Sequence, residues 1–177
     1  MRKIELPIFG KIELENTDYW EYKYEASLWA YAFGELSIDI DVHFKELNAV
    51  NIDKVSWALN DIKKINEMGR VAYSTDFHND GSTSAYIEEW EQEIFCQIFS
   101  DDEFQEFLIP SDKNASIKER LLSLLRLVRI GIYAEADNGF AVMDYAFGYS
   151  MDKGFRDNML VVKLNEQYEV LEITSEG

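Results

Sequence analysis

Apolar and polar residues alternate along two segments in the first third of the chain. From Trp20 to Leu28 and from Leu36 to Phe44, nearly every second residue is apolar. A period of two gives a strand one apolar and one polar face, so both segments are predicted to be half-buried strands. Shorter apolar segments at 4–6 and 11–14 are separated by Pro7 to Gly10, which is turn chemistry. This third of the chain therefore predicts an antiparallel meander.

The middle of the chain changes to helical spacing. Apolar residues three and four apart predict a helix between Asn51, its expected N-cap, and Gly69, its expected C-terminal stop. Asp76 to Ser84 is polar and is predicted to be a loop. A second helical face follows, marked by Ile87, Trp90, Ile94 and Ile98.

Two capping boxes open further helices. Ser100 with Glu103, and Ser116 with Glu119, have the spacing at which serine and glutamate satisfy each other's free backbone donors. The first helix is expected to end near Pro110. The second helix is expected to begin with an apolar stripe, formed by Ile117, Leu121, Leu124, Leu125 and Val128.

The last quarter returns to strands. Residues 129–134 and 140–147 flank Asp137-Asn138-Gly139, a tight-turn signal, and residues 159–164 and 168–173 form a second predicted hairpin. Strands, then helices, then strands indicate an α+β fold, with a largely antiparallel sheet and a central block of three to four helices packed on one face. No linker divides residues 1–177, so we expect one domain.

Charge and composition narrow the possible partners. The 177 residues include 17 Lys+Arg and 34 Asp+Glu, a net charge of −17. Phosphate contacts are made by clustered Lys and Arg, so nucleic acid and anionic membrane surfaces are not expected partners. No run of about 18 apolar residues predicts a membrane span. The lone Cys96 fits a reducing compartment, and the start of the chain has no signal-peptide pattern, so we expect a cytoplasmic protein.

Several strand and turn motifs have the pattern of a known family. They are Leu6-Pro7-Ile8-Phe9-Gly10-Lys11-Ile12, Trp20, Asp80-Gly81-Ser82 through Tyr86-Ile87-Glu88, Met143 to Gly148, Leu160 to Leu164, and Glu172 to Glu176. Spread over most of the chain, they resemble the bacterial DUF2004 family. The resemblance implies a small bacterial cytoplasmic protein of unassigned function. It supplies no active-site residues.

The segment Asp76-Phe77-His78-Asn79-Asp80-Gly81 is the best candidate for a metal site. Alternating ligands before a glycine are typical of a calcium loop. However, His78 stands where an oxygen donor belongs, and Ile87 occupies the position of the closing acidic ligand. The metal hypothesis names Asp76, His78 and Asp80, and the alternative is a turn with a helix cap. No cofactor is expected.

Two other sets of residues suggest chemistry. Asp39, Asp41 and His43 alternate along one strand and could seat a general base or a metal, with a solvated sheet face as the alternative. Cys96 has acidic neighbours, which disfavour a thiolate nucleophile and favour an inert core residue. Motifs for phosphate binding and for a serine nucleophile do not occur.

The densest feature is acidic. Residues 84–119 hold ten acids against two lysines, a net charge of −8. A field of one sign speeds association with an oppositely charged partner, so we predict a non-enzymatic binding protein, in the manner of an immunity protein that neutralises a basic partner. Its predicted contacts are Glu88, Glu89, Trp90, Glu91, Glu93, Asp101 and Asp102.

Three alternatives remain beside this hypothesis. Charge runs usually coat a solvated helix face and serve solubility, and the spacing of Trp90 also suits a core residue. A small metal-dependent enzyme would use the Asp and His sets above. A structural subunit would self-associate, as a homodimer, through an exposed sheet edge.

Overall fold

The computed structural model describes residues 2–7, 10–14, 20–26, 36–42, 49–95, 99–133, 139–147 and 158–176. The strands are β1 (Arg2–Leu6), β2 (Gly10–Leu14), β3 (Trp20–Ala26), β4 (Leu36–Val42), β5 (Leu125–Tyr133), β6 (Ala141–Phe147), β7 (Met159–Leu164) and β8 (Val170–Glu176). The helices, all between β4 and β5, are α1 (Ala49–Asn60), α2 (Ile62–His78), α3 (Ser82–Glu89), the π-helical turn η2 (Trp90–Ile94), α5 (Asp101–Leu108) and α6 (Ile117–Leu124). This order confirms the predicted α+β class.

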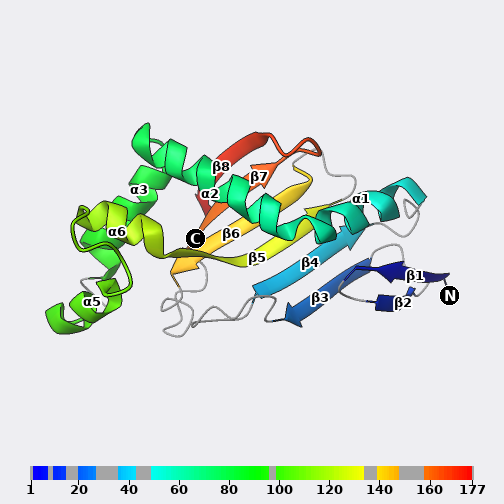
Figure 1. Cartoon of the computed structure of the whole chain (residues 1–177), viewed down its shortest axis with the longest axis horizontal. Helices are drawn as coiled ribbons and strands as arrows, with labels where there is room; N and C mark the ends of the chain where they lie inside the picture. The colour runs from blue at the N-terminus through cyan, green and yellow to red at the C-terminus, as the bar shows by residue number, and fades with distance from the viewer. Residues whose placement is uncertain are drawn as a thin grey trace.

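The main sheet has six strands in the order β3-β4-β5-β6-β7-β8, and β1 and β2 form a separate two-stranded sheet. All neighbouring strands are antiparallel except β4 and β5, which are parallel. Parallel neighbours need a crossover connection, and the helical block supplies it. The sheet is therefore largely antiparallel, as predicted, with one parallel pair. Figure 1 shows α1 and α2 lying across one face of it.

Helix α2 approaches the sheet closely at a glycine. Ile62, Ile65, Asn66, Gly69 and Tyr73 form its buried stripe. A Cβ at position 69 would overlap the Tyr145 hydroxyl and lie 2.9 Å from Met143 Sδ on β6. Gly69 therefore lies inside the helix, where it lets the backbone meet β6. The prediction that it ends the helix is wrong.

The helical block is longer and more divided than predicted. Helix α1 begins at Ala49, so Asn51 lies within it, and a turn at Asp61 separates α1 from α2. Helix α2 continues to His78, and α3 begins at Ser82, so the predicted loop 76–84 shrinks to a short turn. The described residues form five α-helices and η2, more than the three to four predicted.

The turn η2 changes which residues face the core after Trp90. Trp90 and Phe95 are 0% and 2% exposed, and their ring centroids lie 5.1 Å apart. Residues five apart do not share a face in a regular α-helix of 3.6 residues per turn, but the wider π-helical turn aligns them. The predicted stripe holds for Ile87 and Trp90, and Phe95 then joins them in the core.

Both capping boxes are confirmed. Ser100 and Glu103 cap α5, and Ser116 and Glu119 cap α6. The apolar stripe that begins in α6 extends past the helix, because Leu125 already starts β5. Both predicted C-terminal hairpins are also present, as the antiparallel pairs β5–β6 and β7–β8.

No helix in the described part of the chain is both long and apolar enough to cross a membrane.

Candidate functional site

Asp76 organises the turn between α2 and α3. Its Oδ2 accepts a hydrogen bond of 2.7 Å from the backbone N–H of Thr83, in the first turn of α3. A Cβ on Gly81 would overlap the same carboxylate, and Asp80 takes a positive φ of 55°. The acidic side chain thus caps α3. The Asp76 carboxylate therefore has a structural role at this turn.

Of the other proposed metal ligands, His78 is the last residue of α2 and Asp80 lies in the turn. His78 and Asp80 are exposed, and the His78 ring lies edge-on to Phe77, with centroids 5.2 Å apart. Among the described residues, no group of three or more His, Cys, Asp or Glu side chains is placed to hold a metal ion.

Two of the strand candidates lie on a described strand. Asp39 and Asp41 on β4 are register partners of Gly131 and Tyr133 on β5. On β5, Arg129 Nη1 donates a hydrogen bond to Asp144 Oδ2 at 2.8 Å, and Arg129 Nη2 donates one to Tyr133 Oη at 2.9 Å. His43 and Cys96 lie outside the described residues.

The acidic surface consists of the predicted carboxylates on α3, η2 and α5. All are exposed except Glu91, which is half-buried. In this set, Glu88 Oε1 forms an ion pair with Lys118 Nζ at 3.5 Å. Figure 1 shows α3, α5 and α6 gathered at one end of the molecule. The acidic surface comprises Glu88, Glu89, Glu91, Glu93, Asp101 and Asp102.

Trp90 lies beneath this surface, not on it. It is fully buried, and its ring centroid is 5.0 Å from that of Phe147 on β6. Phe95 packs against both rings and also against Phe104 and Phe107 of α5. The prediction that Trp90 contacts a partner conflicts with this burial, which fits the core interpretation. Trp90 instead anchors the backbone that carries the acids.

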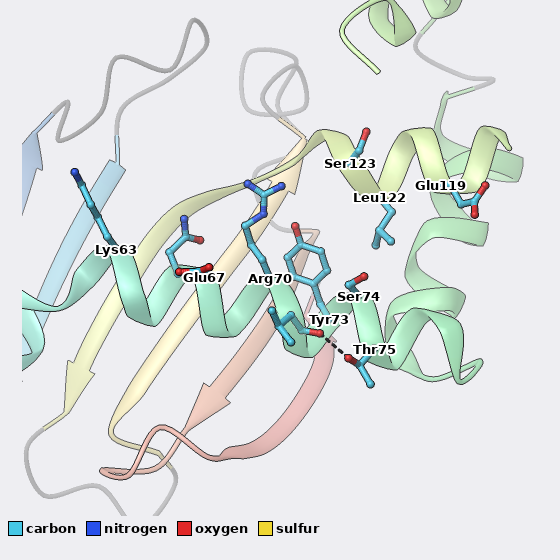
Figure 2. Close-up of a pocket in the computed structure, with 11 residues that line it drawn as sticks. Lys63, Glu67, Arg70, Tyr73, Ser74, Thr75, Glu119, Leu122 and Ser123 are labelled. Atoms are coloured by element: carbon cyan, nitrogen blue, oxygen red, sulfur yellow. Dashed lines mark hydrogen bonds between the residues drawn. The ribbon is translucent and has the colours of Figure 1, made fainter. Parts of the chain in front are cut away.

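A polar groove of about 670 Å³ lies between α2 and α6. Figure 2 shows Lys63, Glu67, Arg70 and Tyr73 on α2, and Glu119 on the facing helix. Its charges are mixed, two basic and two acidic. The groove therefore favours no single ligand charge.

A buried tyrosine network lies beside the polar groove, which its members Asn66 and Tyr73 line. Tyr145 Oη donates to Asn66 Oδ1 at 3.1 Å, and the Tyr73 ring lies edge-on to Tyr145 with centroids 4.9 Å apart. Burial raises the pKa of both Tyr73 and Tyr145. Both hydroxyls are therefore protonated at neutral pH, as expected for structural hydrogen-bond groups and not for general bases.

A second groove, the α2–β8 groove, has a volume of about 730 Å³ and a largely apolar lining. Met68, Val71 and Ala72 line it from α2, and Tyr168 and Val170 line it from the end of the chain. Sequence analysis missed this groove. The exposed position of Val71 in an otherwise amphipathic helix was the only local signal.

Comparison with family models, with curated proteins and with solved structures gives no match. The resemblance to the DUF2004 family therefore stays a prediction.

Proposed function

We propose that this protein is a binding module that captures a basic protein through the acidic surface. One observation carries the proposal: five of its six carboxylates are exposed on one end of the molecule. Exposed charge of one sign attracts a partner of the opposite sign and raises the association rate.

The packing beneath the acids supports this function. Trp90 and Phe95 fix η2 against β6, and the capping box at Ser100 fixes the start of α5. A surface held in one arrangement loses little conformational entropy when it binds. The acids are thus presented on a preorganised scaffold.

The test is a charge reversal with a matched control. The variant Glu89→Lys/Glu93→Lys changes the acidic surface. The variant Glu5→Lys/Asp53→Lys makes the same change in net charge at exposed positions on β1 and α1, at the other end of the molecule in Figure 1. Each tagged chain is used to purify partners from its native host, and binding of a recovered basic protein is then titrated with salt.

We expect a basic protein whose affinity falls between about 0.1 M and about 1 M salt, as the Debye length shortens from about 10 Å to about 3 Å. The reversal in the acidic surface should weaken its association at least tenfold, and the control reversal should change it less than threefold, because steering depends on local charge. Equal losses for the two variants would contradict the proposal. So would a chain that recovers no basic protein.

A further inference from the structure

Exposed apolar side chains gather around the α2–β8 groove. Val71 is 62% exposed and Val170 is 48% exposed, and both line it. Trp57 is 45% exposed and stacks on the lining residue Tyr168, with centroids 4.6 Å apart. Large apolar groups left in water beside one groove are typical of an interaction site.

The groove runs beside an open sheet edge. Strand β8 is the last strand of the six-stranded sheet, so its outer edge has no neighbouring strand in the described part of the chain. The α2 wall of the groove extends from Lys64 to Asn79, and its other wall includes Val170 and Ile173 of β8. The groove therefore follows the first half of β8, and α3 also packs against this strand.

Tyr168 lies at the groove in an unusual backbone conformation. The residue is 3% exposed, and its ring packs between Trp57 and Lys64 Nζ. Its φ of 62° is rare for a bulky side chain, and such backbone strain often accompanies functional sites.

The charges around the groove select the occupant. Glu67, Asp76 and Glu169 line it against one cation, Lys64. A second copy of this chain would bring the same acidic groups to the contact, whereas a basic segment would complement them.

We propose that the α2–β8 groove binds an extended segment of a partner protein in which apolar residues alternate with Lys or Arg, added as a strand along β8. The backbone of the segment bonds the outer edge of β8, and its apolar side chains pack on Val71 and Val170. Its cations point to the opposite face of the sheet, where they approach Glu172 and Glu176 of β8, which share one cation, Lys163. This is strand addition, in which backbone bonds give affinity and alternate side chains give specificity.

The probe is a labelled seven-residue peptide, matched to β8 in length, that alternates valine with lysine. Binding to the full chain is measured by fluorescence anisotropy. Comparison peptides alternate valine with glutamate and serine with lysine. Two further peptides carry backbone N-methyl groups on either the odd or the even residues. Because residues of a strand point their N–H groups alternately to its two edges, only one of these two should lose binding.

The protein variants are matched. Val71→Gln removes an apolar side chain from the groove, and Ile109→Gln makes the same change at a residue 73% exposed outside it. Val71→Gln should weaken binding of the valine–lysine peptide about fivefold to tenfold, the value of an apolar side chain. Ile109→Gln should leave it unchanged, and the other two alternating peptides should bind at least tenfold more weakly.

Several outcomes would overturn the proposal. They are no binding, equal binding of the valine–glutamate peptide, equal losses for Val71→Gln and Ile109→Gln, and equal effects of the two N-methylated peptides. A homodimer in sedimentation that Val71→Gln dissociates would assign the groove to a second copy instead. The readout does not involve Glu89 or Glu93, so failure here leaves the proposed function standing, and the reverse also holds.

Discussion

The acidic surface and the α2–β8 groove belong to one helical block but recognise by different physics. The acidic surface is charged outside and anchored by aromatic packing inside, through Trp90. The groove is apolar outside and depends on where α2 rests on the sheet, which Gly69 sets. Charge acts at a distance and is screened by salt, whereas apolar contact needs an exact fit. The acidic surface is therefore suited to fast association with a charged partner, and the α2–β8 groove is suited to selecting which partner binds.

The largest expected effect tests the anchor of the acidic surface. Trp90→Ala should lower the free energy of unfolding by about 3–5 kcal/mol, the usual cost of deleting a large buried aromatic side chain. Urea unfolding followed by circular dichroism measures it. The matched control is Trp57→Ala, at a residue 45% exposed, which should cost about 1 kcal/mol from the lost stack on Tyr168. Similar losses of unfolding free energy for the two variants would contradict the conclusion that Trp90 anchors the acidic surface.

The next effect tests the contact that positions the groove. Gly69→Ala should lower the free energy of unfolding by about 1–3 kcal/mol because the new methyl group overlaps Tyr145. The better helix propensity of alanine, about 1 kcal/mol, offsets part of this cost. The variant should also weaken binding of the valine–lysine peptide, since α2 must shift relative to β8. Unchanged stability together with unchanged peptide binding would show that α2 is not held at this point.

A second substitution isolates the cause. Tyr145→Phe removes the hydroxyl that the new methyl group meets, at a cost of about 1 kcal/mol for the lost bond to Asn66. In the double variant, part of the Gly69→Ala loss should be recovered, because residues in contact are not additive. Strictly additive losses would locate the strain elsewhere.

The difference between the two regions also explains what the sequence predicts. Capping boxes are local, so Ser100 and Ser116 are correctly placed at the starts of α5 and α6 from spacing alone. Gly69 was misread because glycine ends helices and also permits close contacts, and only the position of Tyr145 distinguishes the two roles. The shift at η2 was missed because a π-helical turn has no sequence pattern of its own. Spacing alone therefore gave no sign that Phe95 shares the buried face of Trp90.

The groove was not predictable because it is built from parts far apart in the sequence. Val71 and Val170 meet only when β8 takes the last position of the sheet, and strand order is not encoded in periodicity. The parallel pairing of β4 with β5 was missed for the same reason. Sequence patterns indicate which face of a helix or strand is buried, but they do not indicate which other elements lie beside it.

The smallest expected effect is a pH dependence confined to the acidic end. The Glu119 carboxylate accepts hydrogen bonds from the Ser116 hydroxyl and backbone N–H, which hold its pKa below 4.5. A lowered pKa stabilises the fold above the unfolded value and loses that contribution as pH falls below 4.5 through the folded value. Glu119→Gln should therefore be less stable than the native chain at neutral pH, and the gap should close in acid. Thermal unfolding from pH 7 downward measures it, with the exposed Glu106→Gln as control. A stability gap that persists in acid would mean that the cap of α6, the helix that carries Lys118, does not depend on the charge of Glu119.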